Sequence, residues 1–487
     1  MPFSRYVSNM VFMPPELEKI LRETPELQRA FLVGGSVRDV FLGRPPGQDF
    51  DIEVFGLDYD RLRQALARWG RTDLVGRSFG VVKLSTGSGQ TYDFTVPRKD
   101  SKVAPGHKGF DVEFDPAITP PEAAARRDFT INSLMYDPRA GQVLDFFGGA
   151  ADLKNRVLRH TSPAFSEDPL RVLRGMQFAG RFDLRAAPET AALSRQIKGS
   201  FPELAVERVR EEWFKWAQQG GRPSAGLRFL IDTEWIDHFP EIKALAGTPQ
   251  EPEWHPEGDV FTHTCHACDA LARLDAWLAA DAESRLVYML AVLAHDFGKP
   301  ATTQTSLKEG RQRLVSPGHD EAGAELAKIF LERLRAQGAI VERVVPLVRN
   351  HLFYHGSVTD RAVRRLAKRL EPESVEGLCL VMTADSMGRP PLPALEPESV
   401  QTLLARARDL NVRAKPPEPI LMGRHLIEAG LRPGKDFAGI LGQAYDAQLE
   451  GAFGDLPGAF AWLAGSAAFA FSEDVKTRLR ARAEGAA

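Results

Sequence analysis

The chain has 487 residues, about three domains' worth at the usual domain size. Apolar residues make up 43% and charged residues 26%, which excludes a disordered or fibrous protein, and no apolar run approaches the ~20 residues of a membrane helix. We expect no secretory signal, and the three cysteines are typical of the reducing cytoplasm. With 62 basic and 65 acidic residues the net charge is −3, so any nucleic-acid binding must rest on local basic patches.

The hydropathy pattern changes about a third of the way along the chain. The first part alternates strand-like runs with helical stretches, and from about residue 151 the apolar period is close to that of a helix. The predicted strands are Phe31–Val33, Phe50–Val54, Gly80–Leu84, Thr91–Val96 and Val143–Phe147, with a helix over Tyr59–Trp69. We therefore expect an α+β fold. Its regions are a head over 1–150, then all-helical regions over 151–250 (neck), 255–390 and 391–487 (tail).

Two glycines follow the first predicted strand and precede an amphipathic stretch. Gly34 and Gly35 come directly after Val33, and residues 36–42 have the pattern of a helix. Without side chains at this turn, backbone amides can approach a ligand, and the start of a helix favours an anionic phosphate. Taken alone, the two glycines would indicate only a plain turn.

Acidic side chains come next. Asp49 and Asp51 are two residues apart on a predicted strand, so they share one face. Two carboxylates at that spacing offer the hard oxygen ligands that suit Mg²⁺, and Asp93 on a later strand is a candidate third. Nucleotidyl transfer with two metal ions needs such a site. The alternative interpretation is an exposed polar strand face.

Four motifs in this order resemble one known family. The turn Gly34–Asp39 with Asp49–Asp51 looks like the nucleotidyltransferase superfamily shared with DNA polymerase β. The further motifs resemble those of the class II tRNA nucleotidyltransferase and bacterial poly(A) polymerase family, and they lie at Arg126–Leu134, Leu144–Gly149 and Glu167–Arg174. The resemblance implies a polymerase β-like head, with a mixed sheet and helices, ahead of a nucleotide-selecting and RNA-binding neck.

The resemblance also implies roles for single residues. Asp49 and Asp51, with Asp93, would be catalytic, and Asp49 and Asp51 would bind Mg²⁺. The nucleotide would contact one glycine and five charged side chains, namely Gly35, Arg38, Arg127, Asp168, Arg171 and Arg174. In this family the protein itself takes the place of a template.

Asp168 and Arg171 have the chemistry to choose a base. At i and i+3 they share a helix face, with Arg174 one turn further on. Cytosine and adenine each present an amine donor beside a ring-nitrogen acceptor, which match a carboxylate and an arginine. Guanine and uracil present the reverse pattern and would leave both side chains unpaired. One such pair can therefore accept CTP and ATP and reject GTP and UTP. In isolation the same spacing would indicate a surface ion pair.

Histidines gather in the middle of the chain, where seven of the eleven lie between His255 and His355. One subset resembles the HD superfamily of metal-dependent phosphohydrolases, namely His263, His295, Asp296 and Asp385. His319 and His351 are candidates for a second metal or for the phosphate. The resemblance implies 2′,3′-cyclic phosphodiesterase and phosphatase activity with a divalent transition metal such as Ni²⁺, Mn²⁺ or Co²⁺. The alternative is a set of core or capping histidines.

A cationic stripe follows the histidines. Its members recur at i, i+3, i+4, i+7 and i+8, namely Arg361, Arg364, Arg365, Lys368 and Arg369. Such a stripe can track RNA phosphates, which makes these residues RNA-binding candidates, although a solvated helix face has the same pattern.

The function that these observations favour is addition or repair of the 3′-terminal CCA of tRNA. Its partners would be the tRNA 3′ end, CTP and ATP, with no membrane and no obligate protein partner. A poly(A) polymerase, or a partial enzyme adding only CC or only A, shares the same motifs. An alternative of another class is an HD phosphohydrolase whose head only recognises RNA, but the paired acids Asp49 and Asp51 argue against it.

Overall fold

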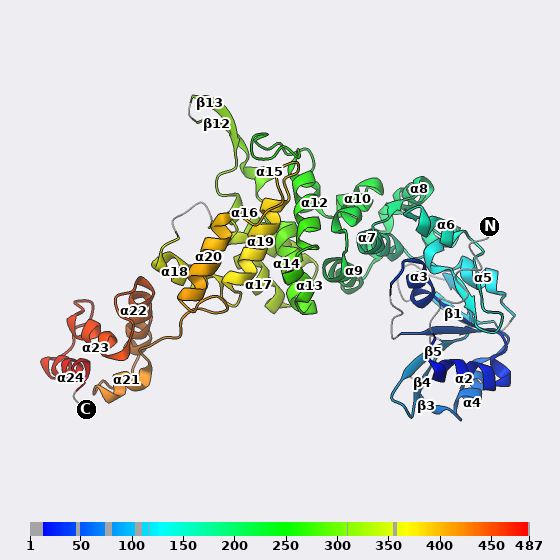
Figure 1. Cartoon of the computed structure of the whole chain (residues 1–487), viewed down its shortest axis with the longest axis horizontal. Coiled ribbons are helices and arrows are strands. Elements are labelled where there is room, and N and C mark those ends of the chain that lie inside the picture. Colours follow the sequence, from blue (N-terminus) through cyan, green and yellow to red (C-terminus); the bar gives the residue numbers. More distant parts are fainter. Residues whose placement is uncertain are drawn as a thin grey trace. The chain divides into compact units, whose positions relative to one another are not determined.

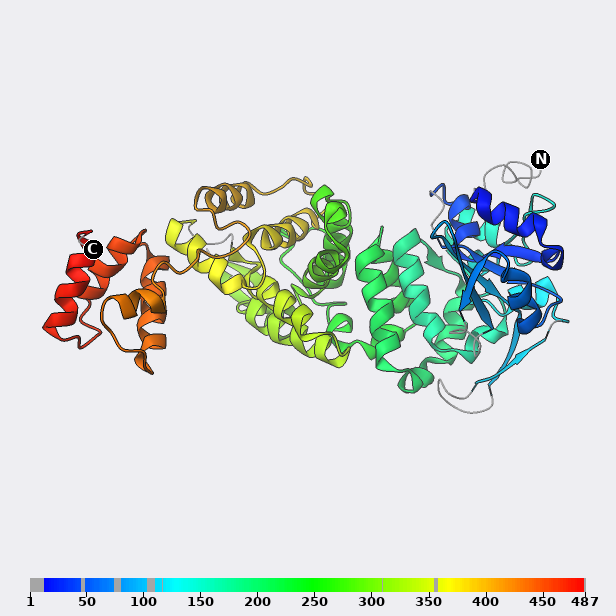
Figure 2. The ribbon, with the colours of Figure 1, turned by 90° about the horizontal axis from the view of Figure 1, so that it is seen from below.

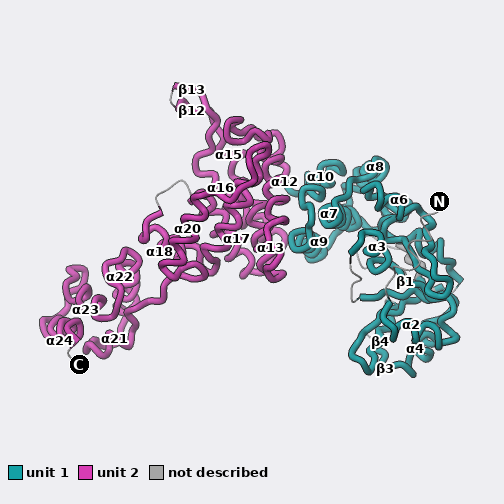
Figure 3. The backbone as a smooth tube through the Cα atoms, in the orientation of Figure 1, with its two compact units in different colours: residues 1–240 teal, residues 241–487 magenta. Residues whose placement is uncertain are grey.

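The computed structural model describes residues 13–44, 49–73, 80–102, 110–115, 117–308, 310–353 and 358–485. The chain forms two compact units, residues 1–240 and 241–487 (Figure 3). Within the described ranges, no helix is both long and apolar enough to cross a membrane. The finer division into four regions stays a prediction.

A seven-stranded mixed sheet is the centre of the first unit (Figure 1). Its strands are β1 (Ala30–Val33), β2 (Asp51–Val54), β3 (Gly70–Asp73), β4 (Val81–Thr86), β5 (Thr91–Thr95), β8 (Met135–Asp137) and β9 (Gln142–Leu144). They lie in the order β3-β4-β5-β2-β1-β8-β9, and β2 and β5 run parallel while the other neighbours run antiparallel. The α+β class is confirmed.

Side-chain alternation along β4 and β5 separates a buried face of the sheet from an open one. Leu84 and Phe94 are fully buried, whereas the neighbouring Lys83 and Asp93 lie on the open face. The helices of the head are α2 (Pro15–Glu23), α3 (Gly35–Phe41), α4 (Tyr59–Leu66), α5 (Pro120–Ala125) and α6 (Gly149–Lys154). A separate antiparallel pair is formed by β6 (Arg98–Lys102) and β7 (Phe110–Phe114).

The strand predicted over Val143–Phe147 ends early. Asp145 accepts hydrogen bonds from the backbone N–H groups of Gly149 (2.8 Å) and Ala150 (3.0 Å), and it thereby caps α6 instead of extending β9. The helix predicted over Tyr59–Trp69 likewise ends at Leu66.

The rest of the first unit is mainly helical. It comprises α7 (Leu170–Phe182), α8 (Pro188–Gln196), α9 (Val206–Gln219) and α10 (Pro223–Asp232), with the short parallel pair β10 (Val157–Leu158) and β11 (Arg185–Ala186). Figures 1 and 2 show α7, α9 and α10 side by side. A Cβ atom at Gly226 would stand 2.6 Å from the Met176 carbonyl oxygen and 2.7 Å from Trp216 Nε1, so only glycine allows this packing.

Short 3₁₀ helices join these elements, at Pro25–Leu27, Thr130–Asn132, Pro163–Glu167, Lys198–Glu203 and Trp235–His238. Along the chain, the boundary between the two units falls within α11 (Pro240–Lys243).

Helices also dominate the second unit. They are α12 (Val260–Leu271), α13 (Asp275–Ala279), α14 (Ala282–Ala294), α15 (Lys299–Thr302), α16 (His319–Arg333), α17 (Gly338–Asn350), α18 (Asp360–Leu370), α19 (Val375–Met387) and α20 (Glu398–Asp409). Polar side chains cap four of them, namely Asp259, Asp281, Thr359 and Ser374, as where Asp259 accepts from the Thr262 N–H (2.9 Å) at the start of α12.

This region also contains a β-hairpin that the all-helical prediction did not include. Strands β12 (Gln304–Lys308) and β13 (Arg311–Val315) pair antiparallel and project from the helices of their unit (Figure 1). The strands are polar and carry no apolar alternation, which is why the pattern analysis overlooked them. The short β10–β11 pair was not predicted either, and neither were β3 and β8 of the head sheet or the β6–β7 pair.

The last four helices share a core of their own. They are α21 (Gly423–Glu428), α22 (Asp436–Glu450), α23 (Leu456–Gly465) and α24 (Glu473–Ala483). Leu426, Phe460, Leu463 and Leu479 are buried together there.

Candidate functional site

The turn between β1 and α3 lies beside the acidic strands. Gly34 has φ +71°, a left-handed conformation in which a side chain would be strained. A Cβ atom at Gly34 would stand 3.5 Å from Arg127 Nη1 and 3.6 Å from Asp51 Oδ2. The predicted glycine turn therefore contacts both an acidic and a basic candidate residue.

Two of the three predicted carboxylates are neighbours in the sheet. Asp51 of β2 is in register with Asp93 of β5, so their side chains leave the same face. Asp49 does not lie on the strand as predicted, because β2 begins at Asp51, which pairs with Val33, the last residue of β1. Asp49 instead precedes the strand by two residues.

The electrostatics of this face favour a bound cation. Although Asp51 is accessible to solvent, the surrounding cleft partly desolvates its carboxylate and raises the pKa. Arg127 opposes this, and the negative charges of Asp93 and Asp49 raise the pKa further. Asp93 Oδ1 makes no hydrogen bond with any described group, and its nearest cation is Lys83 Nζ at 3.7 Å. Crowded carboxylates with unused oxygens fit a hard divalent ion such as Mg²⁺.

Arg38 and Arg127 are fixed beside the turn. The Arg38 side chain is buried, donates to Asn132 Oδ1 (2.7 Å) and lies over the ring of Phe182, 4.3 Å from its centre. Arg127 pairs with Glu53 at 3.1 Å. Both guanidinium groups are therefore held in place on the side of the cleft where the glycine turn lies.

The predicted base-selecting pair is held by neighbours that the sequence analysis did not identify. Asp168 Oδ1 accepts from the Leu170 N–H (3.1 Å), and Oδ2 pairs with Arg208 of α9 at 2.9 Å. Arg171 donates to the backbone carbonyl oxygens of Ala164 (2.7 Å) and Arg126 (2.9 Å). Asp168 lies just before α7, which begins at Leu170, yet both side chains line the same cleft, as their spacing predicts.

Arg174 is bound to a partner within the protein. Its Nε and Nη2 atoms each lie 2.8 Å from Asp128 Oδ2, and Asp128 also accepts from Asn132 (2.9 Å) and from the Phe129 N–H (2.8 Å). Burial opposes ionisation of Asp128, but Arg174 and these hydrogen bonds hold its pKa below the usual range. Arg174 therefore also organises the cleft wall.

One cleft of about 390 Å³ unites these groups. It is lined by Gly34, Gly35, Arg38, Asp51, Arg126, Arg127, Asp128, Asn132, Asp168, Leu170, Arg171, Arg174, Phe178 and Arg208. Asp49 and Asp93 are the predicted head residues outside this lining. Six arginines against three aspartates leave an excess of positive charge, which suits a triphosphate.

The four predicted HD ligands meet in the interior of the second unit. His263 Nε2 of α12 lies 3.1 Å from Asp385 Oδ1 of α19 and 3.2 Å from His295 Nε2. His295 Nε2 lies 3.2 Å from Asp296 Oδ2, just after α14. All four side chains are buried, although His263 and Asp385 are far apart in the sequence.

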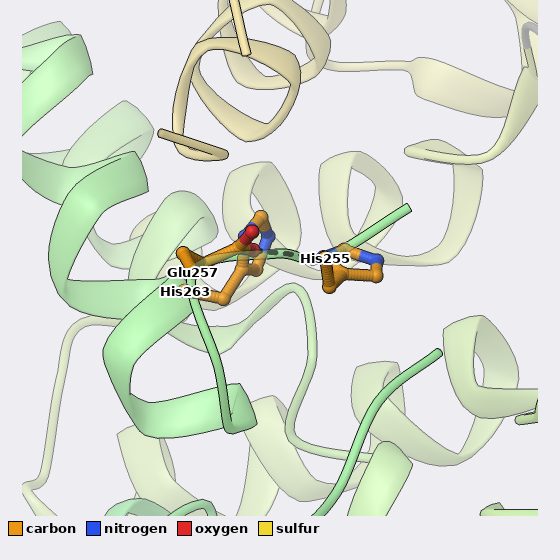
Figure 4. A group of neighbouring side chains, drawn as sticks. All are labelled: His255, Glu257 and His263. Carbon is orange, nitrogen blue, oxygen red and sulfur yellow. Dashed lines mark hydrogen bonds and ion pairs between the residues drawn. The ribbon is translucent and has the colours of Figure 1, made fainter. Parts of the chain in front are cut away.

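Each imidazole in this cluster is oriented through its Nδ1 atom. His263 donates to Glu257 (2.7 Å), while the others donate to carbonyl oxygens, namely His295 to Val292 (2.7 Å), His319 to Ser316 (2.6 Å) and His351 to Val348 (2.6 Å). Figure 4 shows Glu257 next to His263, with His255 on the same carboxylate. Fixing Nδ1 leaves Nε2 of each ring for a metal.

A second group of donors shares Asp296 with the first. The donor atoms of Asp296, His319 and His351 lie within 4.8 Å of one another, as do those of His263, His295 and Asp296. His319 Nε2 is buried and has no hydrogen-bond partner among the described residues. The donor set fits one or two divalent ions bound by imidazole and carboxylate.

The charge balance of the cluster also fits a cation. Burial lowers the pKa of His263, but its hydrogen bonds to Asp385 and Glu257 outweigh this and raise the pKa to about 9. The acidic groups around His263 thus favour a positive charge on or beside its ring. A divalent ion can provide that charge when it displaces the proton from the ring. Burial, followed by the charges of His295 and His319, lowers the pKa of His351 to about 4, so this ring is neutral and able to ligate.

A cleft of about 720 Å³ leads to this cluster. Asp296, His319, His351 and Asp385 line it, together with the cationic side chains of Lys299, Lys308 and Arg389. His255 lines it too, and neither His255 nor Glu257 was among the predicted site residues. Their only sequence signal is proximity to His263.

The stripe on α18 contacts α22 within the same unit. Arg361 and Arg365 both form ion pairs with Glu450, and Arg364 donates to the Leu449 carbonyl oxygen (3.0 Å). Three of the five candidate RNA contacts therefore have partners in the tail.

The other two stripe residues pair close by. Lys368 pairs with Glu371 at 2.6 Å, and Arg369 donates to Asn350 Oδ1 at 3.2 Å. The stripe is therefore a cationic surface already partly neutralised by the protein.

Comparison with known proteins agrees with this geometry. Residues 30–159 match the family described as the poly A polymerase head domain, and residues 260–389 match the HD domain. A multifunctional CCA protein of Xanthomonas campestris pv. campestris is 38% identical over 402 residues, which cover 78% of this chain and 92% of that protein. One from Stenotrophomonas maltophilia is 36% identical over 373 residues, covering 74% and 86%.

Solved structures share the fold. The Bacillus stearothermophilus CCA-adding enzyme in complex with CTP matches with a TM-score of 0.60 at 21% identity, covering 93% of this chain and 97% of that one. The Thermotoga maritima CCA-adding enzyme complexed with tRNA matches with a TM-score of 0.57 at 19% identity, covering 99% and 100%.

The seven-stranded head with its acidic, arginine-lined cleft and the buried His/Asp cluster define a nucleotidyltransferase head joined to an HD domain. The relative from Xanthomonas campestris pv. campestris is 38% identical, and the match covers 92% of its length, which establishes the family. The chain belongs to the multifunctional CCA protein family.

Proposed function

We propose that this chain is a template-independent tRNA nucleotidyltransferase that adds or repairs the 3′-terminal CCA from CTP and ATP. The observation that carries the proposal is the single head cleft in which Asp51, six arginines and the Asp168/Arg171 pair converge. The names of the relatives, multifunctional CCA proteins, point to the same substrate.

In the reaction, the 3′ oxygen of the RNA bonds to the α-phosphorus of the nucleotide and loses its proton. The bond from that phosphorus to the bridging oxygen breaks, and pyrophosphate leaves. Asp51 and Asp93, with Asp49, would hold Mg²⁺, which supplies charge stabilisation at the attacking and leaving oxygens when bound. Arg38 and Arg127 bind the triphosphate from the turn side.

Base choice falls to Asp168 and Arg171. Asp168 is anchored by Arg208 and the Leu170 N–H, and a carboxylate still has lone pairs for the amine of cytosine or adenine. Arg171 uses N–H groups on two carbonyls, and the rest of its five donors remain for a ring nitrogen. Both side chains are fixed by the protein and cannot turn away from an incoming base. A guanine or uracil edge would therefore leave their hydrogen-bonding groups unpaired.

The test supplies tRNA lacking its last three nucleotides with CTP and ATP, together and separately, and sequences the products. Complete CCA with both nucleotides supports the proposal. Products ending in CC alone or A alone would indicate a partial enzyme, and long A tails a poly(A) polymerase. An unextended tRNA would leave the head as an RNA-recognition module.

We propose further that the HD domain is a phosphohydrolase that acts on 2′,3′-cyclic phosphates and phosphomonoesters. His263, His295, Asp296 and Asp385 would hold a divalent transition metal, with His319 and His351 at a second position. When bound, such an ion (Ni²⁺, Mn²⁺ or Co²⁺) would lower the pKa of a water molecule at the site. Opening a cyclic ester adds one water across a P–O bond and leaves a monophosphate and a hydroxyl group.

The assay for this second activity uses chelator-treated protein reloaded with each metal separately and given adenosine 2′,3′-cyclic phosphate. Hydrolysis that depends on the metal and disappears in His295→Ala supports the proposal. If His295→Ala retains full hydrolysis, the cluster is not the site.

The remaining predictions concern RNA contacts and location. The α18 stripe is proposed to bind tRNA phosphates, since Arg361 and Arg365 remain 58% and 48% exposed despite their pairing with Glu450. We place the enzyme in the cytoplasm, which the three free, buried cysteines support.

A further inference from the structure

Trp254 lies on the wall of the HD cleft with 45% of its surface exposed. Tryptophan is usually well buried, so an exposure of this size is unusual for the residue. The metal-ligand cluster lines the same cleft. An exposed aromatic ring and a phosphohydrolase cluster therefore share one cavity.

The β12–β13 hairpin forms the adjoining wall. Gln304, Ser306 and Lys308 line the cleft, as the two-residue period of a strand requires. Ser306 is in register with Arg313, which therefore leaves the same face of the hairpin. The Arg313 guanidinium lies over the Trp254 ring, 5.2 Å from its centre.

Hydrogen bonds fix the tryptophan turn to the hairpin. Glu251 accepts from the Leu314 N–H (2.9 Å) through its carboxylate and from the Trp254 N–H (3.1 Å) through its backbone carbonyl. Glu253 pairs with Arg313 at 2.6 Å. Because these contacts hold the ring before any ligand arrives, stacking on it would require little further ordering.

The chemistry of the cleft points to one class of ligand. At the cluster, Lys299 and Arg389 accompany the proposed metal ligands and suit a phosphate group. Arg313 covers at most one face of the indole, so the exposed remainder can stack on a flat aromatic group. Bases stack on aromatic side chains regardless of sequence, because every base has a π-face. A nucleotide, in which a phosphate ester is joined to a base, matches both the cationic and the aromatic part of the cleft.

We propose that Trp254, backed by Arg313, is the platform on which the base of a nucleotide substrate stacks in the HD site. The proposal rests on the proposed phosphohydrolase function, for which it names a specificity-determining residue. Trp254 would bind the base and so determine which substrates are preferred, while the His/Asp cluster would act on the phosphate.

The first measurement is calorimetric binding of adenosine 3′-monophosphate to the full-length, chelator-treated protein. Trp254→Ala should weaken binding by about tenfold, and Trp254→Phe should restore most of the affinity. The matched control is Leu307→Ala, because Leu307 is 73% exposed on β12 and is not among the residues that line the cleft. Equal affinity of wild type and Trp254→Ala would overturn the proposal.

The second measurement compares hydrolysis of adenosine 2′,3′-cyclic phosphate and of base-less glycerol 1,2-cyclic phosphate by metal-loaded protein. The ratio of the two kcat/KM values should fall about tenfold in Trp254→Ala, through KM. An equal fall for both esters would show that Trp254 only supports the fold, and thermal melting of each variant checks that explanation independently.

The two proposals fail separately. If the wild type hydrolyses neither ester but binds adenosine 3′-monophosphate through Trp254, the phosphohydrolase function fails and the platform stands. If hydrolysis is normal and indifferent to the base, the platform fails and the phosphohydrolase function stands.

Discussion

The two sites of this chain hold their candidate metal ligands in opposite ways. In the head, Asp51 is exposed at a strand start and Asp93 is 38% exposed, with an oxygen that makes no hydrogen bond to the described residues. In the HD domain, His263, His295 and Asp296 are at most 1% exposed. Every ring there is fixed through Nδ1.

This difference follows from what each site must bind. A carboxylate face open to water suits Mg²⁺, which keeps several waters and is usually bound together with substrate phosphates. A buried, pre-oriented imidazole set suits a resident transition metal. The head should therefore depend on its carboxylates for turnover, and the HD domain should depend on its supporting residues for metal affinity.

The largest effect is expected from Asp51→Asn, which should lower nucleotide addition by at least about 10³-fold, because the amide cannot supply the charge that a metal needs. HD hydrolysis should stay within about twofold, since the two sites share no residues. Primer extension and cyclic-phosphate hydrolysis are measured on the same preparation. Asp73→Asn, on the edge strand β3 of the same sheet, is the matched control.

A primer extended at the wild-type rate by Asp51→Asn would remove the metal argument for the head. Equal loss of both activities would indicate misfolding and would break the comparison.

Asp128→Ala tests how much the ion pair between Asp128 and Arg174 stabilises the head independently of any metal. Asp128 is buried while its partner Arg174 is 36% exposed, so removing the carboxylate should lower the free energy of unfolding by about 2 kcal/mol, the order expected for hydrogen bonds to a charged group. Asp73→Ala is the control, since its pair with Arg71 (3.3 Å) is exposed and should contribute under about 1 kcal/mol. Urea titration measures both.

The pH dependence has a definite sign. Because the pKa of Asp128 is depressed in the folded protein, its contribution is complete above the ordinary value of 3.8 and is lost as the pH falls toward the folded value. The stability difference between wild type and Asp128→Ala should therefore be constant from pH 5 upward and shrink below about pH 4. A difference that grows on acidification would contradict this assignment.

Glu257→Gln tests the pre-oriented imidazoles. The amide keeps one weaker contact but loses the charge that holds His263 Nδ1, so metal affinity should fall about 10- to 100-fold. Titration calorimetry with Mn²⁺ or Ni²⁺ measures this, and Glu283→Gln, 61% exposed and distant in sequence, is the control. Unchanged affinity would mean that burial alone organises the HD site.

Residues whose chemistry follows from local spacing could be predicted from the sequence. Asp168 and Arg171 are three residues apart, and His295 and Asp296 are adjacent. A short motif therefore contains both members of each pair and indicates that their side chains act together. Asp128, Arg208 and Glu257 act through partners such as Arg174, Asp168 and His263, which only the fold brings near. Asp128 lies inside the motif Arg126–Leu134, but its pairing with Arg174 does not follow from that motif, and no period or motif marks Arg208 or Glu257.

The fold shows the same limit. Apolar runs mark β1, β2, β4, β5 and β9, which could therefore be found, whereas β3 and β8 of the same sheet were not predicted. Asp49 was placed on β2 although β1 ends at Val33 and offers no partner beyond Asp51. The β12–β13 hairpin is polar and depends on contacts such as that from Leu314 to Glu251, so helical periodicity around it was misleading.

The smallest effect is expected at α18, which belongs to the HD-containing unit although its proposed ligand is the tRNA that the head extends. Glu450→Gln releases Arg361 and Arg365 from their internal acid. If the stripe binds RNA phosphates, tRNA affinity should rise about twofold, and the slope of log affinity against log salt should steepen by up to one unit per released cation. Filter binding across a salt series measures both, with Glu428→Gln, which pairs with Arg482 in the tail, as the control. If tRNA binding is unchanged while the protein melts earlier, the stripe serves only to dock α22. The RNA would then have to reach both sites through contacts outside α18.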